Sequence, residues 1–224
     1  MTKRVHPNVS FKGCVASIND AVDYKSTSCK DDGVVALTVW RKSLLLNCKG
    51  FTVFDCNGNI VFRVDNYVAA NKGEILLMDA HGKPLLTIRR KKLSWGDNWQ
   101  IYEGESCVNP RYLVQKQGNL LSNNTKNMNL AQVQLIPTKA HHQKVKNDCK
   151  ETTLYHIEGS YAQRSVVIYN NTRQCVAEIK KKEAPNGVTL GGDVFKLIIV
   201  RPSDIDCALA MALVILLDQM FGSS

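Results

Sequence analysis

The chain lacks the sequence motifs that most often reveal a catalytic site. It contains no Gly-x-Ser-x-Gly sequence, no Gly-Lys-Ser/Thr phosphate-binding loop, no dinucleotide-binding glycine pattern and no His-Glu-x-x-His. Its five histidines are scattered from His6 to His156, and the adjacent pair His141–His142 lies in a lysine-rich segment that is typical of a solvated loop. These absences predict a protein that is not an enzyme and that holds no cofactor or metal ion.

Nothing near the first residue resembles a secretory signal, because the basic residues Lys3 and Arg4 are not followed by an apolar stretch. The eight cysteines form no Cys-x-x-Cys pair and have no histidine at zinc-ligand spacing. In a reducing compartment we expect such cysteines to be small buried hydrophobic residues or idle surface thiols. We therefore expect a cytoplasmic protein, with peripheral attachment to the plasma membrane or a nuclear location as alternatives.

The composition is that of a globular protein. Hydrophobic residues make up 44% and charged residues 22% of the 224 residues, unlike disordered, collagen-like or multi-span membrane proteins. The length suits one large domain or two small ones. The formal net charge of +9 and the isoelectric point near 9.1 favour anionic partners such as phosphates, nucleic acid or acidic lipid headgroups.

Most of the chain consists of short β-like runs separated by turn residues. Several runs alternate as half-buried strands do; Ile60, Phe62 and Val64, for example, share one face. Many short strands at regular spacing predict a sandwich or a barrel. The twelve predicted strands cover residues 34–40, 51–55, 60–65, 74–79, 84–90, 99–104, 111–116, 130–136, 153–159, 165–170, 174–181 and 193–200.

Three of the predicted hairpins share a turn that begins with Asp55, Asp79 or Asn170. These side chains can accept hydrogen bonds from the backbone two residues on, and Gly58 and Gly82 supply the positive φ that two of the turns require. We interpret them as turn residues; a catalytic role for Asp55, Asp79 or the intervening His81 is the alternative. No loop is biased enough in composition to mark a domain boundary, which favours a single domain.

The C-terminus departs from the β pattern. The run Cys207–Leu217 is apolar on every side of a helical wheel, so the helix must be buried in protein or lipid. Ser203 can cap it, Asp204 and Asp206 favour its positive end, and Gly222 can end it. The run would rise only about 16 Å, roughly half of a bilayer core, so we expect no transmembrane span. A barrel of twelve strands is wide enough to enclose the helix.

Several stretches carry a family resemblance: Phe51–Asp55, Gly58–Asp65, Leu77–Asp79, Pro84–Ser94, Trp99–Gly104, Glu158–Tyr161 and Met211–Asp218. On these the chain resembles the plant LURP-one-related proteins, which are grouped with tubby C-terminal domains and phospholipid scramblases. The resemblance implies a mainly β fold, a twelve-stranded tubby-like closed barrel around a central hydrophobic C-terminal helix. We expect this barrel to span residues 34–224 as one domain, behind a partly ordered N-terminal extension over residues 1–33.

The resemblance implies less about activity, since one fold hosts unrelated functions. Tubby-like domains bind phosphoinositide headgroups and have been viewed as membrane-tethered transcription regulators, scramblases move lipids with calcium, and the plant family is associated with defence without an assigned biochemical activity. The headgroup residues of tubby cannot be placed on this chain one by one. Calcium needs six to eight oxygen ligands, and only Asp204 and Asp206 would supply carboxylates at the start of the helix, which disfavours scrambling.

Basic residues gather after two predicted strands. Residues 1–202 carry a formal charge of +12, and alternate side chains along a strand project together. Paired cations suit phosphates. We predict an anionic headgroup site on a monomer and leave open whether both clusters form it; solvated strand ends, a nucleic-acid-binding regulator and a protein-interaction regulator in plant defence are the alternatives. The predicted site residues are Arg89, Arg90, Lys91, Lys92, Lys180, Lys181 and Lys182.

Overall fold

The computed structural model describes residues 33–45, 48–67, 73–91, 96–117, 129–137, 153–183 and 191–222. The N-terminal extension predicted over residues 1–33 lies almost wholly outside them. The elements are β1 (Val35–Trp40), β2 (Cys48–Phe54), β3 (Ile60–Tyr67), β4 (Glu74–Asp79), β5 (Pro84–Arg90), β6 (Asn98–Glu103), β7 (Tyr112–Lys116), β8 (Asn129–Leu135), β9 (Thr153–Ser160), β10 (Ser165–Asn170), β11 (Cys175–Lys181), β12 (Val194–Ile199) and α1 (Cys207–Phe221).

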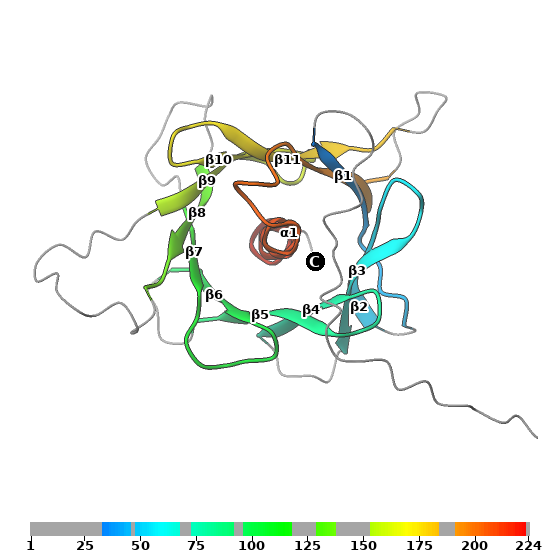
Figure 1. Cartoon of the computed structure of the whole chain (residues 1–224), viewed down its shortest axis with the longest axis horizontal. Coiled ribbons are helices and arrows are strands. Elements are labelled where there is room, and N and C mark those ends of the chain that lie inside the picture. The colour runs from blue at the N-terminus through cyan, green and yellow to red at the C-terminus, as the bar shows by residue number, and fades with distance from the viewer. Residues whose placement is uncertain are drawn as a thin grey trace, which may run out of the picture.

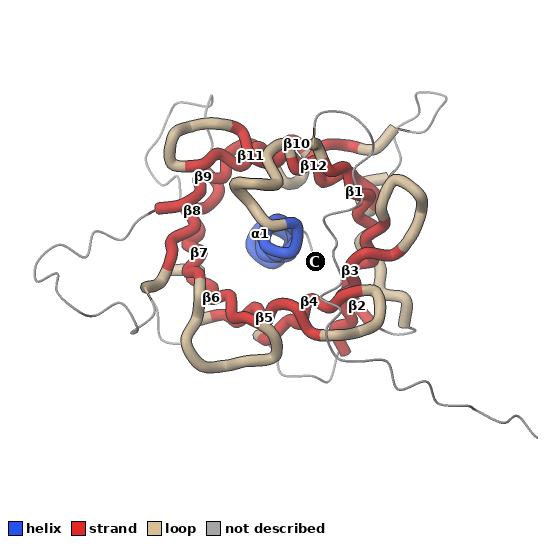
Figure 2. Tube along the Cα trace, in the orientation of Figure 1, coloured by secondary structure: helices blue, strands red, loops and turns tan. Residues whose placement is uncertain are grey.

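The strands form one closed antiparallel barrel. Each strand pairs with its neighbours in the sequence, and β1 closes the ring by pairing with β12. Figures 1 and 2 show α1 in the middle of the ring. The predicted twelve-stranded barrel around a central C-terminal helix is therefore confirmed.

The antiparallel order gives the barrel two distinct rims. All odd-numbered strands end at the same rim, which carries Trp40, Arg90, Lys116 and Lys181 at the ends of β1, β5, β7 and β11. We call it the C-rim, because the C-terminal end of α1 also lies there, with Lys116 bonded to Met220. The opposite rim, where α1 begins, is the N-rim.

Alternation along the strands explains how the interior is filled. Val35, Leu37 and Val39 of β1 point inward and are buried, while the residues between them are half-exposed. Twelve of the fifteen residues of α1 are buried, so the helix that is apolar on all sides meets protein on all sides. The helix thus fills an interior that is too wide for wall side chains alone.

The start of α1 corrects one prediction. Asp206, not Ser203, is the N-cap, and its Oδ2 accepts hydrogen bonds from the backbone N–H groups of Ala208 and Leu209 at 3.1 and 3.3 Å. The hydroxyl of Tyr155 donates to the carbonyl of Asp204 at 2.5 Å, which ties the preceding turn to the barrel wall. The helix therefore begins at Cys207. Gly222 ends it, as predicted.

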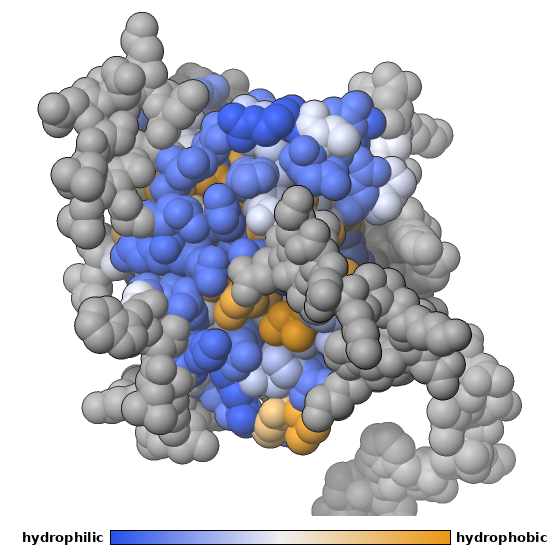
Figure 3. Space-filling view, turned by 90° about the vertical axis from the view of Figure 1, so that its left-hand side faces the viewer, coloured by the Kyte–Doolittle hydropathy of each residue, from blue (hydrophilic) through white to orange (hydrophobic). Residues whose placement is uncertain are grey.

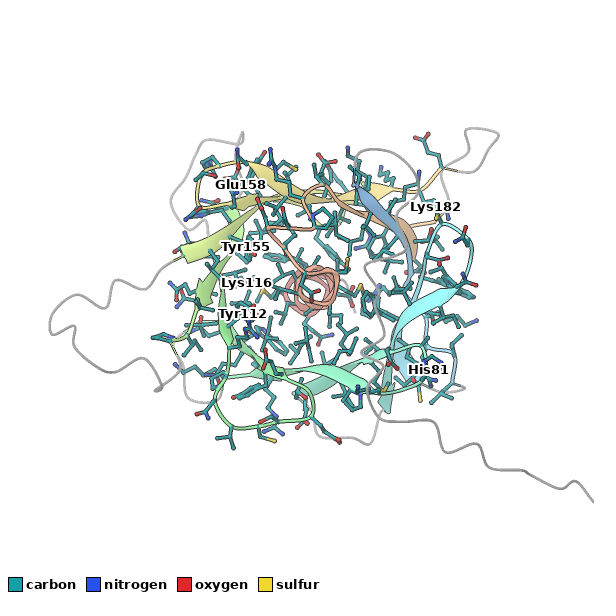
Figure 4. All side chains as sticks on the ribbon, in the orientation of Figure 1. His81, Tyr112, Lys116, Tyr155, Glu158 and Lys182 are labelled. Carbon is teal, nitrogen blue, oxygen red and sulfur yellow. The ribbon has the colours of Figure 1, made fainter. Side chains whose placement is uncertain are left out.

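Charged groups hold the other end of α1 at the C-rim. Arg41 Nε lies 3.0 Å from Asp218 Oδ1, and the hydroxyl of Tyr161 donates to the same oxygen at 3.1 Å. Lys116 Nζ donates to the carbonyl of Met220 at 2.6 Å, between the wall and the helix (Figure 4). A cation is favourable there because the C-terminal end of a helix carries partial negative charge.

The three repeated turns all lie at the N-rim and have one hydrogen-bonding pattern. Oδ1 of Asp55, Asp79 and Asn170 each accepts from the backbone N–H groups two and four residues later. Gly58, Gly82 and Arg173 occupy the equivalent positive-φ position. The assignment of Asp55 and Asp79 to turn chemistry is confirmed, and Asn170 follows the same rule.

The outer wall is mostly polar where Figure 3 views it, over the side that carries β7 to β9. Hydrophobic residues occupy only a small area of that face. Among the helical segments of the described ranges, none has the length and apolar character needed to cross a membrane.

One cysteine contradicts the expectation of free thiols. Cys48, Cys107, Cys175 and Cys207 are free, but Cys56 is disulfide-bonded. Cys56 lies in the β2–β3 turn and is exposed. Nothing in the spacing of the cysteines indicated this bond.

We expect the protein to lose stability at alkaline pH because of two buried groups, the thiol of Cys207 and the phenol of Tyr155. Burial, with nearby Asp206, raises the pKa of the Cys207 thiol from 9.0 to about 11, and burial, with nearby Tyr112, raises the pKa of Tyr155 from 10.0 to about 12. Both groups are neutral in the folded protein. The stability that they contribute is fully present below the unfolded-state pKa and is lost as the pH rises toward the folded-state pKa. Denaturant titrations from about pH 8 to 11 should show a falling free energy of unfolding, and Cys207→Ala should lose about 2 kcal/mol less than wild type. An equal loss in both proteins would contradict this role of Cys207.

Candidate anion-binding pocket

The two arginines at the end of β5 are largely neutralised by neighbouring acids. Arg89 faces Glu74 across the β4–β5 pair, with Nη2 2.5 Å from Oε2. Arg90 Nη2 lies 2.9 Å from Asp97 Oδ1. Lys91 is exposed, and Lys92 lies outside the described residues.

The lysines at the end of β11 and just after it are arranged differently. Lys180 Nζ lies 2.5 Å from Glu178 Oε2 on its own strand, and Lys181 is exposed. Lys182 reaches past β12 and donates from Nζ to Thr38 Oγ1 of β1 at 2.8 Å. Figure 4 places Lys182 on the outside of the barrel, beside β1.

The structure does not bring the two basic clusters together. Both lie at the C-rim, because β5 and β11 are odd-numbered strands. Five strands separate β5 from β11 in either direction around the ring, and Figure 1 shows them on opposite sides of the barrel. A ligand the size of a lipid headgroup can therefore contact one cluster or the other, and the two remain separate candidates.

A further lysine, Lys196, lies outside the basic runs of the sequence and beside the lysines at the end of β11. Lys196 projects outward from β12, between Lys180 of β11 and Thr38 of β1 in the strand register. It is exposed, whereas Phe195 and Leu197 on either side of it are buried. The alternation of buried and exposed residues along β12 explains why Lys196 points outward, but its proximity to Lys182 depends on the closure of the barrel.

Lys182 and Lys196 line a pocket of about 510 Å³ on the outer wall, which we call the β1 pocket. Its floor is the outward face of β1, and the β2–β3 turn forms one side. The lining residues are Ala36, Leu37, Thr38, Phe54, Asp55, Cys56, Gly58, Lys182 and Lys196.

The acid in the lining is already occupied by the turn it builds. The carboxylate of Asp55 accepts hydrogen bonds from the backbone N–H groups of Asn57 and Asn59 and from the Asn59 side chain. Burial alone would raise its pKa, but the hydrogen bonds from Asn59, Asn57 and Gly58 outweigh burial and lower the pKa. Asp55 therefore stays ionised, with its charge directed into the turn.

The lysines of the pocket lack a comparable counter-charge. Lys180 and Lys196 are direct cross-strand partners, an arrangement that is unfavourable for two like charges. Glu178 pairs with Lys180, but within the described part of the chain no carboxylate forms an ion pair with Lys182 or Lys196. An anion in the β1 pocket would supply the missing charge.

Other candidate residues lie apart from this pocket. Asp206 caps α1, and Asp204 Oδ2 accepts from Asn170 Nδ2 at 3.3 Å. No group of three or more metal-binding side chains is found in the described ranges. His81 is exposed in the β4–β5 turn, and the pair His141–His142 lies outside the described residues.

A closed twelve-stranded barrel around a buried C-terminal helix is the class of structure that these observations define. The LURP-one-related family model matches residues 35–218, which is the barrel and most of the helix, and the chain belongs to this family.

Named relatives agree with this assignment, and a solved structure shares the fold. Protein LURP-one-related 8 of Arabidopsis thaliana is 48% identical over 199 residues, covering 88% of this chain and 92% of that protein. Protein LURP-one-related 17 of the same plant is 41% identical, covering 83% of each. An X-ray structure of another Arabidopsis protein matches the fold with a TM-score of 0.53 at 21% identity, covering 83% of this chain and 90% of the other.

Proposed function

We propose that the protein is a non-enzymatic module that binds an anionic membrane lipid headgroup in the β1 pocket. The observation that carries this proposal is the pair Lys182 and Lys196, which line one pocket and form no ion pair with a carboxylate of the described residues. A phosphoinositide headgroup is the ligand we favour. It offers several phosphates on a compact ring, and lysine binds each as a point charge.

The hydrogen-bonding state of Thr38 supports the same ligand. Its Oγ1 accepts from Lys182, so its own O–H remains available as a donor. Two ammonium groups, of Lys182 just after β11 and of Lys196 in β12, and the hydroxyl of Thr38 in β1 thus face one space. Because β12 pairs with both β1 and β11, these donors are held on a rigid wall.

The proposal predicts that Lys182→Ala with Lys196→Ala weakens binding to phosphoinositide-containing vesicles by roughly thirtyfold. Each cation near an acidic membrane contributes about 1 kcal/mol, and two together correspond to that factor. Co-sedimentation with phosphatidylcholine vesicles, with and without phosphatidylinositol bisphosphate, measures the effect at physiological salt.

Arg89→Ala with Arg90→Ala is the matched control. It removes the same charge from the same rim, but from the opposite side of the barrel and from residues already paired with Glu74 and Asp97. We expect a loss of no more than about threefold. If the control weakens binding as much as the pocket variant, the pocket is not the site.

Nucleic acid is tested in the same experiment. Salt weakens the binding of lipid headgroups and of nucleic acid alike. Duplex and single-stranded DNA are therefore compared with vesicles at matched ionic strength. Base recognition needs a groove-entering helix or exposed aromatic residues among the cations, and α1 is enclosed by the barrel. Tighter binding to DNA than to vesicles would replace the lipid with a nucleic acid. Binding to neither would leave a protein partner as the better explanation.

A further inference from the structure

Hydrophobic side chains are exposed at the C-rim beside the β1 pocket. The exposed fractions are 37% for Trp40, 47% for Leu44 and 36% for Leu45. Trp40 projects from the outward face of β1, two residues beyond Thr38, and the two leucines follow in the β1–β2 loop. We call these three residues the hydrophobic turn.

The loop that carries the leucines is fixed to the barrel. The hydroxyl of Ser43 donates to Asp65 Oδ1 at 2.5 Å and accepts from the backbone N–H of Leu45 at 3.0 Å. Ser43 itself is buried, and the backbone N–H of Cys48 donates to the carbonyl of Leu45 at 3.4 Å. The exposure of Leu44 and Leu45 is therefore built into a hydrogen-bonded turn.

Lysine side chains lie on the Trp40 side of the hydrophobic turn. Lys42 Nζ lies 5.2 Å from the centre of the Trp40 ring. Lys182 contacts Thr38, the next outward residue along β1, and Lys181 is exposed at the same rim. A tryptophan with flanking lysines suits the boundary between lipid headgroups and acyl chains, where the ring is amphipathic and the ammonium groups reach the phosphates.

We propose that the hydrophobic turn inserts into the surface of an anionic bilayer while the β1 pocket holds a headgroup. The barrel would then dock with its C-rim and the outer face of β1 toward the membrane. This proposal rests on the proposed function, which it deepens by naming the orientation and the inserted residues. The charge around the turn favours an anionic bilayer as its occupant. Apolar insertion would add affinity that the cations alone do not supply.

The test uses the full chain and phosphatidylcholine vesicles that contain a few mole per cent of phosphatidylinositol bisphosphate. Leu44→Ser with Leu45→Ser should weaken vesicle binding about tenfold, because the membrane would no longer bury the 47% and 36% of these leucines that is exposed. Binding of soluble inositol trisphosphate, measured by calorimetry, should stay unchanged. With brominated acyl chains, tryptophan fluorescence should be quenched on binding, and Trp40→Phe should remove that part of the quenching.

The matched control is Val108→Ser with Leu135→Ser. These side chains are 70% and 42% exposed, but they lie toward the N-rim. We expect this variant to bind vesicles as the wild type does. Equal losses in both variants, or no quenching that depends on Trp40, would overturn the insertion of the turn.

The soluble headgroup separates the two proposals. If inositol trisphosphate binds and depends on Lys182 and Lys196 while the leucine variant keeps full vesicle affinity, the pocket stands and the insertion is wrong. If inositol trisphosphate does not bind, the proposed function fails first. Loss of binding to a protein partner rather than to vesicles would assign the turn to a protein interface and overturn the bilayer.

Discussion

Replacing Leu213 by aspartate is expected to leave no folded protein at neutral pH. Leu213 lies at the middle of α1 and is 0% exposed. The substitution removes a buried leucine, which costs about 2 to 5 kcal/mol, and buries a carboxylate without a partner, which adds several kcal/mol more. Together these terms match or exceed the roughly 5 to 15 kcal/mol that stabilises a typical domain. Circular dichroism and thermal unfolding of the purified chain measure the outcome.

Gln219→Asp is the matched control for Leu213→Asp. Gln219 lies in the last turn of the same helix but is exposed, so the same carboxylate meets water. The partial negative charge at this end of the helix destabilises an aspartate at position 219 by no more than about 1 kcal/mol. A Leu213→Asp protein that stays monomeric with the wild-type unfolding transition would show that α1 is not the core. So would a chain ending at Pro202 that still unfolds cooperatively.

Gly159→Ala is expected to destabilise the barrel by roughly 2 to 5 kcal/mol. Gly159 has a φ of +117°, which residues with a side chain rarely adopt. An added Cβ would lie 2.2 Å from the carbonyl oxygen of Ser165. Gly159 pairs with Val166 across β9 and β10, so the clash falls inside the sheet. Backbone strain and overpacking each cost about 1 to 3 kcal/mol. Urea unfolding of the variant gives the difference directly.

Gly192→Ala provides the comparison for Gly159→Ala. A Cβ at Gly192 has no atom within 4 Å, and its φ lies outside the left-handed region. We expect a change within about 0.5 kcal/mol, as for surface substitutions in general. Unfolding midpoints that fall equally in both variants would mean that the close approach at Gly159 does not constrain the sheet.

The strands, the turns and the central helix follow from local sequence. Alternation placed all twelve strands with ends no more than three residues from those observed. The turns at Asp55, Asp79 and Asn170 were predictable because an Asx side chain bonds its own backbone over two residues. The run Cys207–Leu217 could only be a buried helix, since it has no polar face.

The contacts between strands could not be predicted in the same way. Ser203 and Asp206 are both acceptable caps, and the bond from Tyr155 to Asp204 fixes the turn before the helix. Likewise Arg89 binds Glu74, fifteen residues earlier, only because the register of β4 and β5 places the two residues opposite each other.

The position of Lys196 beside Lys182 has the same origin. It depends on the pairing of β12 with strands from the two ends of the chain. A local basic run identified Lys180, Lys181 and Lys182 as candidates. It could not identify the lysine and threonine that the closed barrel brings to them.

The proposed location of the headgroup is tested most directly by backbone amide chemical shifts of the isotope-labelled protein during titration with inositol trisphosphate. The account predicts that the largest shifts occur around the β1 pocket, at Thr38, Gly58, Lys182 and Lys196. Arg89 and Lys91, on the opposite side of the ring, should stay unchanged. Shifts concentrated at the end of β5, with no shifts around the β1 pocket, would contradict the proposed site.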